Sequence, residues 1–393
     1  MNVRKLEASE RFDSRVISAV AFHRRIEDED KAREESLKES AEDWGAFSDD
    51  GAMMAHIINN KYESFIDGTL VKNGGIGAVS TMPEYRNSGA VREIFRHLLP
   101  AANADGEAVS TLFPFNHAFY RKFGYETVPY RNEYCFAPSV LAAAGYRFDG
   151  RARLWKPGDS AEEFTGVYSR FAENFCLMMR RDDKMMTGRL GGGYLKERRF
   201  GYLLSSGEKP VAYVIYQDKR QDSRSLLSVE DLAFDGPEGF AAILGFLARF
   251  TADYSSIQLI LPRCIELYSV IKTPRAYEIE KKTDQSYMIR VVSVPKLLAV
   301  IRKPEGTDFT IRVTGDEFIP DNNGTFRVTM DGAERTADAP ADMEADIRAL
   351  GQLCAGVVSL EEARYRDDVR ICGKAGMLTG VFPGKPHFVE DHF

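Results

Sequence analysis

The chain has little of what marks a membrane or secreted protein. No apolar run among its 393 residues approaches the ~20 residues that a membrane-spanning helix needs. The first residues, MNVRKLEASERFDSRV, contain no apolar segment of the kind that a secretory signal requires. We therefore expect a cytoplasmic protein that does not bind a membrane.

Paired cysteines and metal-binding histidines are also missing. The cysteines stand far apart without a C-x-x-C pair, and the six histidines show no H-E-x-x-H or similar spacing. We therefore expect neither disulfides nor a zinc site, and we predict no metal; a reducing compartment fits this composition. The five cysteines are Cys135, Cys176, Cys264, Cys354 and Cys372.

The chain has fewer positively than negatively charged residues. The 52 lysines and arginines are outnumbered by 59 aspartates and glutamates, which gives a formal net charge of -7. This balance argues against nucleic acid as a partner. An acidic surface suits a cationic substrate such as an amine, although mildly acidic surfaces are also common in proteins that bind no cation.

The length predicts more than one domain, because a single hydrophobic core rarely organises so many residues. The alternation of helix and strand patterns indicates a mixed α/β (α+β) fold. We place the domains at residues 1–138, 139–290 and 291–393.

In the first segment we predict a helix over Phe12–Phe22 and a solvated helix or flap over the charged stretch Arg24–Asp43. Apolar residues recur at helical spacing over residues 91–99, which predicts an amphipathic helix that Pro100 kinks or ends. A short helix is expected over Asn116–Phe123. Strands are predicted at Trp44–Phe47, Met53–Ile58, Ser64–Val71, Gly77–Thr81 and Ala108–Phe113.

The middle segment repeats the strand, turn, helix and strand order of residues 77–113, which indicates an internal structural repeat. Its loop Asp235–Glu238 lacks the arginine and the glycine spacing of the earlier loop, so we expect no cofactor site there. The last segment predicts hairpins, with turns at Asn322-Asn323-Gly324 and Asp331-Gly332, and a helix behind them.

The most informative stretch is GGIGAVSTMPEYRNSGAVREIF, residues 74–95. Its loop, which begins at Arg86, joins a strand to a helix, where unpaired backbone N–H groups and the helix dipole attract an anion. Gly89 permits close approach of phosphate oxygens, and Arg86 or Arg92 can donate charge-assisted hydrogen bonds. The loop is neither a Walker A loop nor a dinucleotide-binding G-x-G-x-x-G. It suits a pyrophosphate, although R-x-x-G alone is also typical of a structural turn.

The order of these elements resembles the GNAT superfamily of acetyl-CoA-dependent N-acetyltransferases. The R-x-x-G loop resembles their CoA pyrophosphate loop, and Phe119–Tyr125 resembles their late F-Y-x-x-x-G-F/Y segment. VSTMPEYRNSGAVR together with LFPFNHAFYRKFGYE, the three-part length and the terminal aromatic residue resemble the enhanced intracellular survival (Eis) family. This resemblance implies two tandem GNAT-like domains, the second degenerate, and a C-terminal sterol-carrier-like domain. One departure is Val91, where many GNAT loops have glycine or alanine.

The resemblance also implies roles for single residues. Tyr120 would be the general acid that protonates the departing CoA thiolate, and the terminal carboxylate of Phe393 would be the general base for the attacking amine. Strand residues would line the pantetheine, the loop would cradle the pyrophosphate, and two residues after the next strand would touch the cofactor. These acetyl-CoA-binding residues would be Val79, Ser80, Thr81, Arg86, Asn87, Ser88, Gly89, Ala90, Val91, Arg92, Phe115 and Asn116.

Each catalytic role has an alternative. Tyr120 has the spacing of a core aromatic with Phe119 and Phe123, and last residues such as Phe393 usually fray. Other candidate bases are His117 and His392. Acids that could receive a cationic substrate, or simply face solvent, are Glu27, Asp28, Glu390 and Asp391.

The sequence therefore predicts transfer of acetyl from acetyl-CoA to a primary amine, by direct attack in a ternary complex. The Eis resemblance implies acceptors such as aminoglycosides, lysine side chains or polyamines, and assembly as a homohexamer. Two alternatives stay open: an apolar-ligand-binding or scaffolding protein with a vestigial acetyltransferase domain, and an acyltransferase for longer acyl-CoAs.

Overall fold

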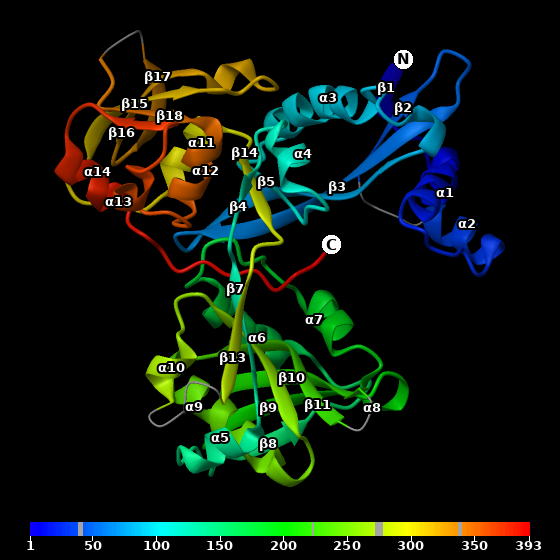
Figure 1. Ribbon diagram of the computed structural model, residues 1–393, viewed down its shortest axis with the longest axis vertical. Coiled ribbons are helices and arrows are strands. Elements are labelled where there is room, and N and C mark those ends of the chain that lie inside the picture. Colours follow the sequence, from blue (N-terminus) through cyan, green and yellow to red (C-terminus); the bar gives the residue numbers. More distant parts are fainter. Residues whose placement is uncertain (38–41, 222–223, 272–277, 337–339) are drawn as a thin grey trace.

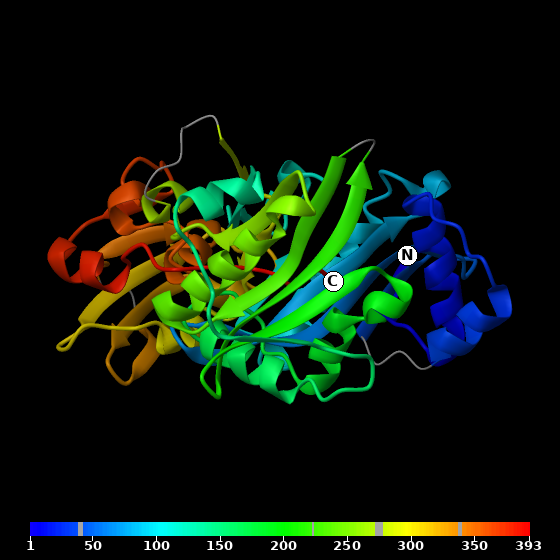
Figure 2. The ribbon, with the colours of Figure 1, turned by 90° about the horizontal axis from the view of Figure 1, so that it is seen from below.

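The computed structural model describes residues 1–37, 42–221, 224–271, 278–336 and 340–393. Across these ranges the chain builds three β-sheets, and we name each sheet with its helices the first, second and third unit. The second unit lies below the other two in Figure 1, and the C-terminal residues run between them. Seen from below, the third unit lies at one end, helices α1 and α2 at the other, and the second unit over the middle (Figure 2). Residues 38–41 of the predicted charged stretch lie outside the described ranges.

The first sheet has the strand order β1-β2-β3-β4-β5-β14-β6 over the described residues. β3 and β4 form a long antiparallel hairpin, and β4 pairs parallel with β5. The strands are β1 (Asn2–Lys5), β2 (Glu42–Phe47), β3 (Met53–Ile66), β4 (Thr69–Thr81), β5 (Val109–Leu112), β6 (Glu126–Thr127) and β14 (Met288–Val291).

Helix α3 (Ala90–Ala104) packs across β2, β3 and β4. Its apolar stripe is fully buried, because Ile94, Phe95, Leu98 and Leu99 each expose at most 1% of their surface. The remaining helices of this unit are α1 (Arg11–Ala21), α2 (Glu29–Leu37) and α4 (His117–Arg121), with 3-10 turns at Ala8–Glu10 and Pro83–Tyr85.

Two local predictions need correction. Pro100 lies on the exposed side of α3 and does not end it, because the helix continues to Ala104; a kink at this residue stays a prediction. The predicted strand Ser64–Val71 is two strands, because Asp67 and Gly68 adopt φ of 50° and 81° and turn the chain between β3 and β4. Apolar residues on both sides of that turn make the run look continuous.

The second sheet has the order β13-β7-β12-β11-β10-β9-β8 in the described part of the chain. As in the first unit, an antiparallel hairpin leads through a helix to a parallel strand: β10 and β11, then α9, then β12. The strands are β7 (Arg131–Phe136), β8 (Arg151–Leu154), β9 (Arg199–Ser206), β10 (Lys209–Gln221), β11 (Arg224–Phe234), β12 (Ser256–Pro262) and β13 (Ile279–Asp284).

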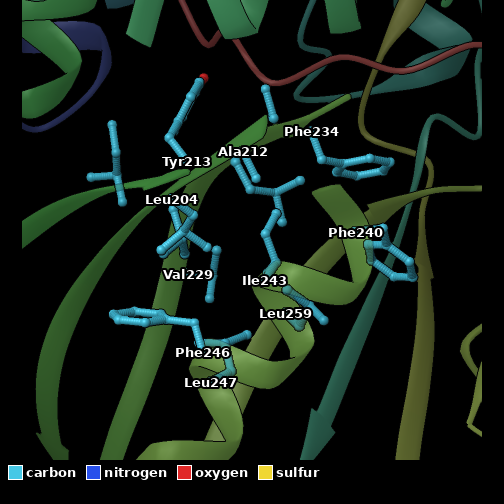
Figure 3. Close-up of a cluster of buried hydrophobic side chains, with 14 of the residues drawn as sticks. Leu204, Ala212, Tyr213, Val229, Phe234, Phe240, Ile243, Phe246, Leu247 and Leu259 are labelled. Carbon is cyan, nitrogen blue, oxygen red and sulfur yellow. The ribbon is translucent and has the colours of Figure 1, made fainter. Parts of the chain in front are cut away.

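Helices close the second unit. In Figure 3, α9 (Gly236–Leu247) directs Ile243, Phe246 and Leu247 toward the strands, where they meet Val229 and other buried side chains. The remaining helices are α5 (Pro138–Ala143), α6 (Glu162–Ala172), α7 (Asp183–Leu190), α8 (Gly193–Lys196), a 3-10 turn at Ala248–Ala252 and α10 (Leu267–Val270).

Two strands join the first and second units. β7 follows β6 in the chain but pairs with β12 and β13 of the second sheet. β14 returns from the second unit and inserts between β5 and β6, where Met288 faces both Leu112 and Thr127. The domain division after residues 138 and 290 stays a prediction. β7 lies before residue 138 but belongs to the second sheet, and β14 begins before residue 290 but belongs to the first sheet.

The third unit contains a sheet of order β17-β16-β15-β18-β19, as far as the described residues extend. The predicted turns at Asn322-Asn323-Gly324 and Asp331-Gly332 do lead into β16 and β17. Its elements are α11 (Val294–Val300), β15 (Asp308–Thr314), a 3-10 turn at Pro320–Asn322, β16 (Gly324–Thr329), β17 (Gly332–Thr336), β18 (Met343–Asp346), α12 (Ile347–Cys354), α13 (Leu360–Ala363), β19 (Val369–Ile371) and α14 (Ala375–Val381).

A buried arginine ties the third unit to the first. Arg290 in β14 is fully buried and donates to the carbonyl of Phe123, just beyond α4, at 2.8 Å. It also donates to Asp316 of the third unit at 2.6 Å. The same carboxylate accepts the backbone N–H groups of Phe318 and Ile319, which pack into the core of the first unit.

Removing the Arg290 guanidinium leaves Asp316 buried without its counter-charge. We expect Arg290→Met to lower the free energy of unfolding by about 3–5 kcal/mol. Arg290→Met combined with Asp316→Asn should recover part of that loss, because the amide oxygen still accepts the two N–H groups. Denaturant unfolding of the single and double variants measures both effects, and strictly additive losses would show that the pair does not interact.

Candidate active site

The two central strands of the first sheet separate. β4 pairs with β5 only over Asn73–Ile76, opposite Val109–Leu112. Beyond Ile76 a bulge distorts β4 against β3, and Ala78 adopts a left-handed φ of 50°. The edge of residues 77–81 that faces β5 therefore has no ladder partner among the described residues, and Val79, Ser80 and Thr81 lie on that edge.

The loop after β4 forms an open cradle at the start of α3. Asn87 and Gly89 have φ of 65° and 85°, and Gly89 is the N-cap of the helix. A Cβ built on Gly89 meets nothing within 4 Å, so its backbone is open to a ligand. The N–H groups of Val91 and Arg92 have no partner within the helix, because they belong to its first turn. Ser88 lies at the same helix start, and its hydroxyl accepts from the N–H of Ala90 at 3.4 Å.

The two arginines of the loop differ in environment. Arg86 is exposed beside the cradle. Arg92 forms an ion pair with Glu317 of the third unit, and its guanidinium carbon lies 5.3 Å from the centre of the Phe318 ring. The positive charge nearest the cradle therefore comes from Arg86 and the helix dipole, while Arg92 also holds the third unit in place.

Tyr120 is buried in α4 with 3% exposure, surrounded by aromatic rings. Its ring centre lies 5.3 Å from that of Phe115 and 6.2 Å from that of Tyr125. Burial, with a smaller contribution from Tyr125, raises the pKa of its phenol well above the usual value. No described residue forms a hydrogen bond with its hydroxyl.

Phe115 and Asn116 occupy the short connection between β5 and α4. Phe115 exposes 68% of its surface, which is unusual for a phenylalanine beside a core cluster. Asn116 caps α4 by accepting the N–H of Phe119 at 3.0 Å. His117 is bound at 3.0 Å to the carbonyl of Gln285. The capping role of Asn116 is structural, while the exposed Phe115 ring is open to a ligand.

The last residue lies against β4. The ring of Phe393 packs between Phe113, directly after β5, and Tyr62 of β3, with ring centres 5.5 and 5.2 Å away. Its carboxyl carbon lies 3.9 Å from the position that a Cβ on Gly77 would take. Gly77 is the first β4 residue beyond the β5 ladder, so the terminal carboxylate stands at the mouth of the strand gap.

The segment that leads there, residues 386–393, is named the C-terminal tail. It crosses from the third unit between the other two (Figure 1), and the backbone N–H of Phe388 donates to the carbonyl of Cys176 at 3.1 Å. His392 stacks on Phe113 and lies 3.3 Å from Arg131. Part of His392 is exposed, but the surrounding residues remove water from its ring. This desolvation, together with the positive charges of Arg131 and Arg189, lowers the pKa of His392 to about 4.

Sequence analysis missed the buried charges that hold the tail. Arg181 is fully buried and contacts Asp231 at 2.8 Å, Asp391 at 2.9 Å and Glu390 at 3.7 Å. Arg189 also contacts Asp231 at 2.8 Å. Glu390 and Asp391 are therefore interior groups and not the exposed acids that the sequence left open, because these arginines compensate their burial. No local pattern marks Arg181 or Asp231.

Burial and the proximity of Asp231 raise the pKa of Glu390 well above its usual range. Although burial opposes it, the two arginines lower the pKa of Asp231. With Glu390 neutral, two cations balance two carboxylates, so the cluster carries no net charge.

The described residues contain no group of three or more His, Cys, Asp or Glu side chains arranged to hold a metal ion. None of their helices is long and apolar enough to cross a membrane.

Comparisons with known proteins give related domain families and folds. Residues 2–128 match the acetyltransferase (GNAT) domain family, and residues 294–389 match the sterol carrier protein domain family. An uncharacterised N-acetyltransferase of Streptomyces coelicolor is 25% identical over 345 residues, which cover 81% of this chain and 82% of that protein. Eis1 of Mycobacterium abscessus has a TM-score of 0.83 at 21% identity, with all of both chains covered. A GCN5-related N-acetyltransferase of Anabaena variabilis has a TM-score of 0.86 at 18% identity, again over both whole chains.

These matches show an N-acetyltransferase with an acetyltransferase (GNAT) domain over residues 2–128 and a sterol carrier protein domain over residues 294–389. Its fold is similar to that of Eis1 along the whole chain.

The pKa of Glu390 makes stability depend on pH. Above the ordinary glutamate pKa of about 4.3, the unfolded chain loses this proton while the folded chain keeps it, so rising pH destabilises the fold until the buried carboxyl ionises. The variant Glu390→Gln has no carboxyl group at this position that could lose a proton. We expect the unfolding free energy of the wild type to fall by about 1.4 kcal/mol per pH unit relative to Glu390→Gln within that window. Parallel pH dependence of the two proteins, measured by denaturant unfolding, would contradict this assignment.

Proposed function

We propose that the chain transfers the acetyl group of acetyl-CoA to a primary amine by direct attack within a ternary complex. The observation that carries the proposal is the position of the Phe393 carboxyl carbon, 3.9 Å from the Cβ position of Gly77, at the mouth of the gap between β4 and β5. A basic group, an unpaired strand edge and an anion-binding helix start thus border one gap.

Acetyl-CoA fits the residues on this gap. Within the loop from Asn87 to Arg92, the unpaired N–H groups of Val91 and Arg92 suit a diphosphate, because they lie at the positive end of α3. The free edge of Val79, Ser80 and Thr81 offers donors to the pantetheine and to the thioester carbonyl. Phe115, exposed at the start of α4, would contact the cofactor together with Asn116.

The terminal carboxylate of Phe393 would act as general base. An ammonium must lose a proton before its nitrogen can attack the thioester carbon, and the carboxylate would take that proton. The rings of Tyr62 and Phe113 flank Phe393 and limit its hydration, which makes a carboxylate a better base. The nitrogen–carbon bond then forms and the carbon–sulfur bond breaks.

Tyr120 would serve as general acid toward the departing thiolate. Its raised pKa keeps the phenol protonated at neutral pH, as this role requires. A phenol is a weaker acid than a thiol in water, so Tyr120 would first stabilise the thiolate by donating a hydrogen bond and would complete the transfer in the dry gap.

The acceptor would be a small-molecule or lysine-type amine, with aminoglycosides and polyamines as examples. The net charge of -7 and the acidic first turn of α2, Glu29 and Asp30, support a cationic acceptor. The homohexamer and the cytoplasmic location rest on the family resemblance and on sequence composition, and sedimentation tests the first of these.

Binding of an apolar ligand in the third unit is the less favoured function. The interior of this unit is filled by Phe309, Ile311 and Phe326, each at most 1% exposed. A cavity of about 330 Å³ at its margin is bordered by the charged side chains Asp67 and Lys385, which suit no sterol. A preference for longer acyl chains would depend on the space beside Val79.

The function predicts a dependence on both substrates. CoA release, followed with a thiol reagent over a panel of primary amines, should require acetyl-CoA and an amine together. Release that no amine raises above hydrolysis would favour the binding-protein alternative.

The role of Phe393 predicts a specific loss. Semisynthesis of the chain with a C-terminal amide removes the carboxylate and keeps the ring, and we expect kcat to fall about 100-fold or more with a small change in CoA affinity. The matched control is the ligated chain with its free acid. An unchanged rate for the amide would remove Phe393 from the mechanism.

A further inference from the structure

The second unit repeats the strand gap of the first. β11 pairs parallel with β12 only over Leu226–Ser228, and the two strands then separate. A bulge shifts β11 against β10 just beyond that point, as the bulge at Ala78 shifts β4 against β3. Leu232 follows the last paired residue, Ser228, at the same interval at which Ser80 follows Ile76.

This second gap does not suit a diphosphate. Asp235 stands at the N-cap of α9, where its carboxylate pairs with Arg170 at 3.2 Å and Lys209 at 3.0 Å. This carboxylate occupies the helix start and pairs with both cations, so they are already engaged. Gly236, the first residue of α9, has no atom within 4 Å of its Cβ position, whereas the Cβ position of Gly239, three residues later, lies 2.3 Å from the carbonyl oxygen of Val211.

The C-terminal tail occupies the gap instead. The backbone N–H of Leu232, on the β11 edge, donates to Oε1 of Glu390 at 3.2 Å. Only about 10 Å³ remains open among Arg131, Ile260, Glu390 and residues 229–232. Upstream, Phe388 is fully buried among the aromatic residues of the second unit.

The cluster of buried charges around Arg181 fixes how far the tail extends along the second unit. Arg181 donates to both oxygens of Asp391, at 2.9 and 3.1 Å, and Tyr168 donates to the same carboxylate at 3.4 Å. Asp391 lies two residues before Phe393, a span of at most ~7 Å. A slip of the tail by one residue would separate the Asp391 carboxylate from a fully buried cation, which is strongly unfavourable.

We propose that the second unit uses its strand gap as a dock for the chain's own C-terminal tail, and that Arg181 and Glu390 are positioning residues for the Phe393 carboxylate. The gap of the second unit, which does not suit CoA, thereby places the Phe393 carboxylate at the gap of the first unit. The docking stands on the contacts alone, and its catalytic consequence rests on the proposed function.

Hydrogen exchange of the full-length protein tests the dock without catalysis. The Leu232 amide should be protected in the wild type and in Glu390→Gln, which keeps the accepting oxygen, and should exchange at least 10-fold faster in Glu390→Ala. An unprotected Leu232 amide in the wild type would overturn the proposal without need of any variant.

A second measurement follows the tail end itself. Carboxypeptidase should release Phe393 at least 10-fold faster from Asp391→Ala than from the wild type, and kcat should fall about 10-fold with the KM for acetyl-CoA within twofold. Asp308→Asn, which breaks a surface pair with Arg327, controls for general effects of losing an acid. Thermal melts confirm that each variant is folded.

The outcomes separate the two claims. Faster release of Phe393 with unchanged kcat would support the dock and count against Phe393 as the base. Equal release rates from Asp391→Ala and the wild type would overturn the dock, whatever the activity.

Discussion

The structure depends on a local break in β-pairing. Ala78 holds a left-handed φ of 50°, a conformation that costs an ordinary residue about 1–3 kcal/mol. The break turns β4 away from β5, and the separated strands leave backbone donors unpaired beside the start of α3. The left-handed alanine thus lies where the free strand edge begins, beside the start of α3. A regular parallel pair would bury the same residues and bind nothing.

The first and second units both contain a strand gap beside a helix start, but the two gaps differ in what they hold. In the first unit the loop Arg86–Val91 and the exposed Gly89 leave the helix start open. In the second unit Asp235 places a negative charge at the equivalent helix start, and the strand gap holds part of the chain. The degenerate copy is therefore a structural partner of the active one.

Much of the first unit was accessible from sequence because its signals are local. The loop before α3, the stripe of α3 and the hairpin turns each lie within about 20 residues, and the structure has these elements. The insertion of β14 beside β5 and the Arg181–Asp391 pair join residues far apart in the chain. A strand sequence does not specify its neighbour, and an isolated arginine resembles any surface arginine. These features follow from tertiary packing, which no periodicity encodes.

Charges, rather than apolar contacts alone, hold the last residues of the tail. Apolar packing of Phe388 supplies free energy but tolerates small shifts, because hydrophobic contacts have little directional preference. The Nε–H of Arg181 is shared between the two carboxylate oxygens of Asp391, at 2.9 and 3.1 Å, and a shift of the tail would break this charge-assisted contact. Burying these ions contributes little net stability and gives specificity of position. A base that must approach one nitrogen within hydrogen-bond distance requires that positional accuracy more than it requires additional stability.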